Sequence, residues 1–328
     1  MFKNVATQNF NMFIEIRKVG RKKKYYLVHS FRHGKKVEKI RRYLGADINK
    51  KELERKKKIA EQQILHRVKV FKKINDPLLE VLTEKEIKEI KELQTKKLFR
   101  VFHLSEEQWK TFSEIFTYNT NAIEGSELDL KEVKNILEKN KWPKDKNKED
   151  ISEAYGVRDA IKFIRKTKEH VSIDLIKKIH EIVFKNSKSF AGKTRPRGIE
   201  VVVRNGFGFI VHQGAPSEKV IILLKELVKW YNKYKNKYPP ILLASVIHNQ
   251  FENIHPFEDG NGRVGRILMN NILIKHNLPP VNIDFKKRKQ YYQVLQEYEN
   301  NHNIRPTIEL ILEEYKSLKK QLKVTTKK

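Results

Sequence analysis

The spacing of apolar and polar positions divides the chain into a short β-rich start and a long helical remainder. Residues 12–43 alternate apolar and polar positions in three runs, separated at Gly20 and Gly34, which is typical of short antiparallel strands. Residues 49–73 are rich in Lys and Arg at helical spacing, and a second charged helical run follows Pro77. We therefore expect a small sheet followed by exposed helices.

From about residue 100 onward the pattern is helical, with one exception. Residues 105–108, Ser-Glu-Glu-Gln, resemble a capping box that opens a helix. The amphipathic helices predicted after it are 130–139, 149–166, 172–185, 217–235, 240–254, 263–276, 286–299 and 307–322. The exception is 198–213, where a β-branched run and an Asn205-Gly206 pair predict a hairpin. Because a lone hairpin is marginally stable in water, we expect it to border a site.

Charge is unevenly distributed along the chain. Its 328 residues carry 70 Lys or Arg and 40 Asp or Glu, a net charge of +30. Residues 1–75 hold 23 Lys or Arg and 6 Asp or Glu, so 17 of these net charges lie in less than a quarter of the chain. At roughly 100–200 residues per domain, the length suggests about two domains. We expect the divisions to be 1–48, 49–99, 100–316 and a basic tail at 317–328.

The composition also excludes several classes of protein. Cysteine is absent, which excludes a disulfide framework, a thiolate nucleophile and a Cys-based metal site. No apolar run approaches the ~18–20 residues that a membrane span needs, and the first ten residues lack the apolar stretch of a secretory signal. We expect a cytoplasmic protein without a membrane partner.

The basic start of the chain permits several partners. Aromatic residues interleave with its positive charges, at Tyr25, Tyr26, Phe31 and Tyr43, and this combination suits phosphate backbones. A nucleic acid bound through residues 1–75 is therefore one expectation. The same segment suits two other roles, which are presentation of target proteins and formation of a homodimer through its helix.

Three of the 13 glycines fall within six residues, at Gly260, Gly262 and Gly265. They lie in the stretch HPFEDGNGRVGR, residues 255–266, between two segments of helical spacing. This predicts a tight loop that runs into the start of a helix. Glycines there let backbone N–H groups converge, and a helix N-terminus adds further donors and partial positive charge. The loop is therefore a candidate anion site.

The side chains around this loop extend the chemistry. Arg263 and Arg266 are spaced i, i+3 and leave the same side of the first turn, which favours a polyphosphate over a single phosphate. Asp259 is placed to hold Mg²⁺ against phosphates, and His255 is able to accept a proton near neutral pH. Together these are the groups needed for attack on a nucleotide phosphate.

The stretch HPFEDGNGRVGR resembles in full the motif of the Fic family, HPFx(D/E)GNGRxxR, and residues from roughly 100 to 316 resemble the Fic domain in order. The resemblance implies a mainly α Fic-domain helical fold with a β-hairpin flap, here preceded by a small basic β+α module. It also implies a nucleotidyltransferase: AMP from ATP is transferred to a Ser, Thr or Tyr hydroxyl of a protein target, and pyrophosphate is released.

The resemblance further implies roles for individual residues. His255 would deprotonate the target hydroxyl, Asp259 would bind Mg²⁺, and Asn261 with the amides of Gly260 and Gly262 would hold the α-phosphate. By the same likeness, Arg263 would contact the β-phosphate and Arg266 the γ-phosphate. Val201, Val202 and Val203 of the flap would pair with the target. Tyr291, Tyr292 and Asn300 would lie on the adenine side. The family often has Asn seven residues after the second Tyr, whereas this chain has Glu299 there and Asn300 next.

A second resemblance concerns regulation. Thr120-Asn-Ala-Ile-Glu124-Gly125 resembles the (S/T)xxxE(G/N) inhibitory helix of Fic proteins. Glu124 paired with Arg266 would occupy the γ-phosphate clamp and prevent ATP from binding in line for attack. A charge-assisted pair is worth ~1.5–3 kcal/mol, which corresponds to a ~10–100-fold brake.

Other interpretations of the same residues remain open. GNGRVG also fits a dinucleotide-binding loop with Asp284 as the ribose acid, but that fold requires a strand before the first glycine. Residues 192–194 mimic the end of a P-loop, but Ser187 stands where the leading Gly belongs, so we discard that interpretation. His248 with His255 and Asp259 would make a metal trio, although a structural role for His248 is favoured.

Alternative functions also remain. The same site suits removal of AMP from a modified protein, with Glu124 orienting the hydrolytic water, or transfer of another phosphate-containing group. A non-enzymatic alternative is a nucleic-acid-binding regulator whose Fic domain senses ATP.

Overall fold

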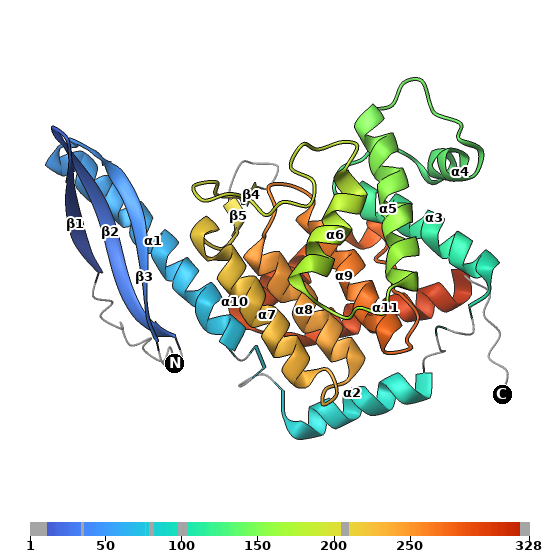
Figure 1. Cartoon of the computed structure of the whole chain (residues 1–328). Helices are drawn as coiled ribbons and strands as arrows, with labels where there is room; N and C mark the ends of the chain where they lie inside the picture. The colour runs from blue at the N-terminus through green and yellow to red at the C-terminus, as the bar shows by residue number, and fades with distance from the viewer. Residues whose placement is uncertain are drawn as a thin grey trace. The chain divides into compact units, whose positions relative to one another are not determined.

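The computed structural model describes residues 12–33, 36–75, 77–78, 82–97, 101, 104–204 and 210–321. The chain divides into two compact units, Met1–Asp76 and Pro77–Lys328 (Figure 1). Across the described residues, no helix combines the length and the apolar character needed to cross a bilayer.

The first unit is a three-stranded antiparallel sheet with one helix. The strands are β1 (Met12–Val19), β2 (Lys22–His33) and β3 (Lys36–Ala46), in the order β1-β2-β3. The helix α1 (Lys50–Asn75) packs against β2 and β3. Apolar side chains between helix and sheet are buried, among them Leu27, Phe31, Ile40, Leu44, Ala60 and Ile64. The predicted sheet and the helix after it are confirmed.

The second unit is helical apart from one hairpin. Its helices are α2 (Glu84–Lys97), α3 (Glu106–Ile123), α4 (Leu130–Lys139), α5 (Lys148–Lys166), α6 (Ile173–Phe184), α7 (Val220–Tyr234), α8 (Pro240–Ile254), α9 (Asn261–Lys275), α10 (Arg288–Asn301) and α11 (Arg305–Gln321). The hairpin is formed by β4 (Val202–Arg204) and β5 (Ile210–Gln213), which pair antiparallel. The predicted mainly α fold is confirmed, and the Asn205-Gly206 turn lies outside the described residues.

Helices α8 and α9 form the centre of the second unit (Figure 1). Every residue of α8 from Ile241 to Ile254 is buried, including polar residues of its second half such as His248, Asn249 and Gln250. Helices α3, α5 and α6 pack against α9, while α7, α10 and α11 pack against α8. The loop between the two central helices is therefore held at both ends by the core.

The start of α3 is fixed by the predicted capping box. Ser105 Oγ accepts from the backbone N–H of Gln108 at 3.2 Å, and Gln108 Oε1 accepts from the backbone N–H of Ser105 at 2.9 Å. Both bonds satisfy donors that a helix N-terminus leaves without intrahelical partners. Fixing this end matters because the other end of α3 reaches the candidate site at Glu124.

Candidate active site

The loop that joins α8 to α9 has a shape imposed by its neighbours. His255 ends α8 in the left-handed region, with φ of 51°. Arg195 is buried, its Nε donates to the His255 carbonyl at 2.8 Å, and its backbone N–H donates to Pro256 at 2.9 Å. Asn261 exchanges two hydrogen bonds with the backbone of Phe257, at 2.9 and 3.0 Å. The expected phosphate ligand Asn261 thus uses its side chain to close the loop.

A buried histidine supports the same loop from below. His180 stacks on Phe257 with ring centroids 3.8 Å apart, and its Nδ1 accepts from the backbone N–H of Gly192 at 2.8 Å. Its Nε2 therefore carries the proton and donates to the Asp259 carbonyl at 3.2 Å. Burial lowers the pKa of His180 to about 4, so this support stays neutral.

The imidazole of His255 is held in its neutral form. Its Nδ1 lies 3.1 Å from the carbonyl oxygen of Glu252, which only accepts, so Nδ1 carries the proton and Nε2 keeps its lone pair. Burial, reinforced by the neighbouring ring of His212 at 5.2 Å, lowers the pKa of His255 to about 3. At neutral pH the imidazole is therefore uncharged, and the lone pair on Nε2 is available.

The start of α9 forms an anion site that a carboxylate already occupies. The N-cap is Gly260 at φ of 80°, where a Cβ would come within 2.3 Å of the Phe184 ring. A Cβ on Gly262 would lie 2.2 Å from Glu124 Oε1. The glutamate from α3 therefore lies directly against the first turn of α9, where backbone N–H groups and the helix dipole favour negative charge.

Among the described residues, four hydrogen bonds hold the side chain of Arg266. Its Nη2 donates to Glu124 Oε1 at 2.7 Å and to the Thr120 carbonyl at 2.9 Å, and its Nε donates to Thr120 Oγ1 at 2.8 Å. Its Nη1 donates to the Tyr291 hydroxyl at 3.2 Å. The structure thus brings both key residues of the expected inhibitory motif onto the arginine that was expected to bind the γ-phosphate.

Arg263 turns to a different glutamate. It forms an ion pair with Glu153 of α5, and both side chains are buried. Its guanidinium lies over the Phe184 ring, 4.6 Å from the centroid, and 3.7 Å from Asp259 Oδ1. Although Arg263 and Arg266 are three residues apart on α9, their partners come from α5 and α3 respectively.

A cavity of about 770 Å³ opens in front of these groups. This is within the range of about 300–1,000 Å³ typical of small-molecule sites. Its walls come from the hairpin, the α8–α9 loop, α10 and the end of α3, and include Val201, Val202, Val203, His212, Glu252, His255, Asp259, Gly260, Asn261, Gly262, Tyr291, Tyr292, Glu299 and Glu124. Arg263, Arg266, Thr120 and Asn300 do not line it.

The expected adenine-side residues are placed unequally. Tyr291 is buried, with its hydroxyl 3.0 Å from His248 Nε2, and the Tyr292 hydroxyl donates to the Ile123 carbonyl at 3.2 Å. Asn300 is exposed, whereas Glu299 lines the cavity and its Oε2 lies 3.0 Å from His212 Nδ1. His248 is thus a partner of Tyr291 rather than one of a metal trio.

Asp259 is suited to hold a magnesium ion only together with a substrate. Its side chain is half exposed, Oδ1 accepts from the Gly260 N–H at 2.6 Å, and Oδ2 lies 3.6 Å from Lys188 Nζ. Across the described residues there is no group of three or more His, Cys, Asp or Glu that could hold a metal ion. Mg²⁺ is commonly bound through one carboxylate plus phosphates and water, so the donor set fits a metal that arrives with a polyphosphate.

Three residues of the site escaped the sequence analysis as site residues. Glu153 pairs with Arg263 across 110 positions, and Arg195 lies 60 positions before His255. His212 lies beside His255, and its buried Nε2 has no hydrogen-bond partner among the described residues. For His212 a signal exists, since it lies within the segment predicted to border a site.

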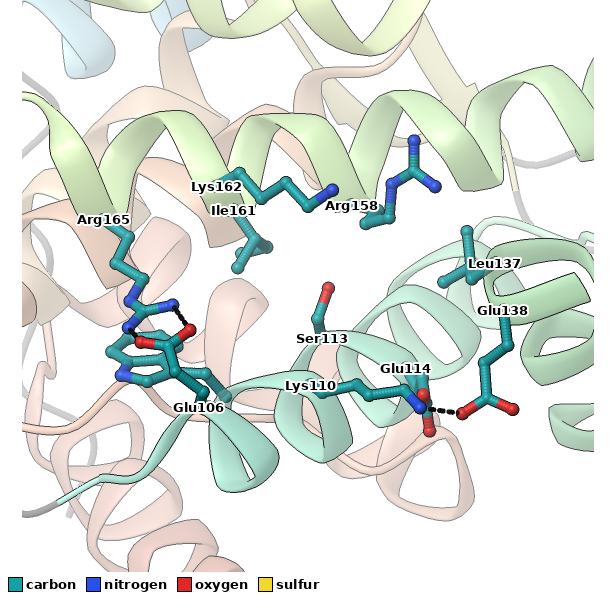
Figure 2. Close-up of a pocket in the computed structure, with 11 residues that line it drawn as sticks. Glu106, Lys110, Ser113, Glu114, Leu137, Glu138, Arg158, Ile161, Lys162 and Arg165 are labelled. Atoms are coloured by element: carbon teal, nitrogen blue, oxygen red, sulfur yellow. Dashed lines mark hydrogen bonds and ion pairs between the residues drawn. The ribbon is translucent and has the colours of Figure 1, made fainter.

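A second, smaller cavity of about 220 Å³ lies between α3 and α5 (Figure 2). Figure 2 shows Arg165 paired with Glu106 at one end and Lys110 paired with Glu138 at the other. Burial, together with a hydrogen bond to Glu138, raises the pKa of Glu114. The positive and negative side chains that line this cavity largely balance one another, and we assign no ligand to it.

Comparison with known proteins shows which family this site resembles. Residues 170–273 match the Fic/DOC family. The chain is 32% identical over 199 residues to a protein adenylyltransferase Fic of Nematostella vectensis, covering 59% of this chain and 45% of that protein. It is 31% identical over 206 residues to the protein adenylyltransferase fic-1 of Caenorhabditis elegans, covering 60% and 38%. The chain spans less than half the length of these curated relatives.

Solved structures agree on the fold. A Fic-domain signaling protein of Bacteroides thetaiotaomicron matches with a TM-score of 0.61 at 22% identity, covering 72% of this chain and 95% of that one. Fic-1 of C. elegans matches with a TM-score of 0.60 at 24% identity, covering 83% and 85%. Helix α8 leads into the glycine loop where a dinucleotide fold requires a strand, so that rival interpretation is wrong. The predicted resemblance is confirmed to this extent: residues 170–273 match the Fic/DOC family, and the fold is that of solved Fic-domain structures.

Proposed function

We propose that this chain is an autoinhibited protein adenylyltransferase, which transfers AMP from ATP to a Ser, Thr or Tyr hydroxyl of a protein target. The observation that carries the proposal is the shared cavity: the base His255 and the glycine-capped start of α9 line one space of about 770 Å³. The names of the two relatives, both protein adenylyltransferases, support the reaction class.

The proposed chemistry uses His255 as the general base. Its Nε2 takes the proton of the target hydroxyl as the hydroxyl oxygen attacks the α-phosphorus of ATP. The new O–P bond forms while the bond from the α-phosphorus to the bridging oxygen breaks, and pyrophosphate leaves with that electron pair. Such base assistance contributes about 10²–10⁴-fold, and N–H groups at the start of α9 stabilise the negative charge on the phosphate.

Asp259 would hold Mg²⁺ against the phosphates of the bound nucleotide. A bound Mg²⁺ would neutralise charge on these phosphates and assist departure of pyrophosphate. The half-exposed carboxylate supports this role because it faces the cavity and keeps Oδ2 available beyond its contact with Lys188.

The hairpin would position the target by strand addition. Among the described residues β4 and β5 form a two-stranded sheet, so each has one edge that pairs with no further described strand. Val201, Val202 and Val203 line the cavity beside His255, which would bring a hydroxyl on the added strand close to the base.

Glu124 would act as the brake. Its carboxylate lies against Gly262 and pairs with Arg266, so it takes the position and the partner that a phosphate needs. Unlike the buried arginine, Glu124 is 28% exposed and lines the cavity, so a competing anion has access to it. The alternative reaction, removal of AMP, would use the same carboxylate to orient water.

Mass spectrometry would test this proposal. The full-length protein, with and without Glu124→Gly, is incubated with Mg²⁺-ATP and a cell lysate, and peptides carrying an added AMP are sought. We expect adducts with Glu124→Gly and at least a ~10²-fold loss when His255→Ala is added. If no adduct forms, and the protein instead releases AMP from a target adenylylated beforehand, removal is the reaction. Failure of both reactions would refute the proposed class.

A further inference from the structure

The sheet of the first unit has two unlike faces. Residues directly opposite each other in antiparallel strands point to the same side, and alternate residues point to opposite sides. Leu27 and Ile40 lie on the face that α1 covers, and both are fully buried. The register places Phe13, Tyr26 and Tyr43 on the opposite side, since Phe13 pairs with Val28 and Tyr26 pairs with Tyr43. We call this side the open face.

The open face presents accessible aromatic rings. Phe13 is 49% exposed and Tyr43 is 51% exposed, both large fractions for side chains of this size. The rings of Tyr26 and Tyr43 lie 5.3 Å apart, and the guanidinium of Arg17 lies 5.4 Å from the Tyr26 centroid. Ring and cation therefore stand side by side on one surface, as stacking platforms for nucleobases require.

Positive charge surrounds these rings. By the same register, the open face carries the exposed side chains of Arg17, Arg32, Lys39 and Arg41. Glu15 lies on this face between two of them and accepts from Arg17 Nε at 2.6 Å and Arg41 Nε at 2.9 Å. One carboxylate thus orders two guanidiniums and leaves the face with a positive surplus.

We propose that the open face is a binding site for single-stranded nucleic acid, with bases stacked on Tyr43 and Phe13 and phosphates held by the flanking arginines and lysine. The surplus of 17 positive charges within residues 1–75 supplies the electrostatic attraction. This site is separate from the proposed adenylyl transfer, since none of its residues lines the cavity at His255.

The rings decide between single and double strands. In a duplex the base faces are covered by neighbouring base pairs, so the exposed rings of Phe13 and Tyr43, on the two outer strands, would meet sugar and phosphate only. In a single strand the base faces are accessible, and stacking on aromatic side chains adds affinity that does not depend on sequence. Charge alone would attract either form.

Fluorescence anisotropy of the full-length protein would test the site. The probes are fluorescein-labelled 20-nucleotide single strands of RNA and of DNA with mixed sequence, and the 20-base-pair duplex. We expect at least one single strand to bind more tightly than the duplex. Tyr43→Ala is expected to weaken that binding roughly 10-fold, whereas Tyr43→Phe, which keeps the ring, retains it. Circular dichroism verifies that each variant is folded.

A matched pair of double variants separates the face from overall charge. Arg32→Gln with Lys39→Gln removes two charges from the open face and should reduce the slope of log affinity against log salt by about 1.4. Arg55→Gln with Lys58→Gln removes the same residue types from exposed positions of α1 and should leave the slope nearly unchanged.

Several results would overturn the proposal. An equal decrease of the salt slope in both double variants would mean that net charge attracts the strand non-specifically. Duplex binding that is as tight as single-strand binding and insensitive to Tyr43→Ala would exclude stacking. Binding to vesicles of phosphatidylserine and phosphatidylcholine, without binding to any oligonucleotide, would make the face a membrane contact instead.

Discussion

The two arginines of α9 form the same kind of ion pair in two different surroundings. Arg263 pairs with Glu153, whose side chain is 6% exposed in the interior of α5. Arg266 pairs with Glu124, whose side chain is 28% exposed at the C-cap of α3 and faces the cavity. The carboxylate of Glu153 is enclosed by protein. The carboxylate of Glu124 faces the cavity, so a ligand that displaces it can reach Arg266.

This difference separates structural support from regulation. A buried ion pair is costly to break, because removing one partner leaves the other charged and desolvated. A pair that opens onto a cavity can exchange one anion for another without exposing its arginine. We therefore expect the Arg263 pair to stabilise the fold and the Arg266 pair to control activity. Four predictions follow in order of expected effect.

Glu153→Gln should destabilise the second unit most strongly. Loss of the carboxylate leaves Arg263 buried without its counter-charge, which costs roughly 3–5 kcal/mol in free energy of unfolding. Urea unfolding followed by circular dichroism measures the change. Glu149→Gln is the control, since Glu149 lies one turn earlier on α5, is exposed and pairs with Lys188 at 3.0 Å. Equal unfolding midpoints for the two variants would remove the distinction between the pairs.

Glu124→Gly should release activity. Freeing the start of α9 and Arg266 for a phosphate is expected to raise labelling about 10–100-fold, corresponding to ~1.5–3 kcal/mol. Incorporation of α-labelled ATP into lysate proteins measures this. Glu127→Gly, three residues further along and exposed, is the matched control and should label like the wild type. If Glu124→Gly labels no better than this control, the brake is assigned wrongly.

His248→Gln should flatten the dependence of stability on pH. Burial lowers the pKa of His248 to about 3, against about 6.5 in the unfolded chain. As pH falls below 6.5, the unfolded chain binds a proton that the folded chain refuses, so stability present at pH 7 is lost. At pH 5 the loss is about 2 kcal/mol for this histidine. Urea unfolding at both pH values should show a smaller drop for the variant, and identical drops would contradict the assignment.

Thr120→Val should release the brake partially. The variant keeps the side-chain shape but loses the hydroxyl that accepts from Arg266 Nε at 2.8 Å. Loss of this hydrogen bond weakens the inhibitory arrangement around Arg266 by about 1 kcal/mol, which predicts about fivefold more labelling. Thr117→Val is the control, because this buried hydroxyl, one turn earlier on α3, has no hydrogen-bond partner among the described residues. Labelling that rises equally in both variants would point to a general effect on α3.

Contacts between residues close together in the sequence were easier to predict than contacts between distant residues. The stretch from His255 to Arg266 encodes its own loop and helix start through glycine placement, and the strands of the first unit follow from apolar alternation. The pairing of Glu124 with Arg266 was predictable because a short motif marks both partners. Glu153 bears no such mark: it pairs with Arg263 because α5 packs on α9, a tertiary contact that no local pattern encodes.

The same limit applies to how side chains are used. The resemblance implied a phosphate contact for Asn261, which stays a prediction, but it gave no sign that both polar atoms of this side chain bond to the backbone of Phe257. Likewise, the pairing of His212 with Glu299 joins the hairpin to α10 across 87 positions. Such contacts depend on the packing of distant segments, which composition and spacing do not specify.

The position of Glu124 has a consequence for how fast the site responds. It follows the last helical residue of α3, so its carboxylate is able to swing away from Arg266 by rotation about side-chain bonds alone. No backbone hydrogen bond of the helix has to open. Side-chain rotations of exposed groups occur within picoseconds to nanoseconds, far faster than helix or domain rearrangements. Arrival of the competing anion, rather than remodelling of the fold, would then set the pace of release.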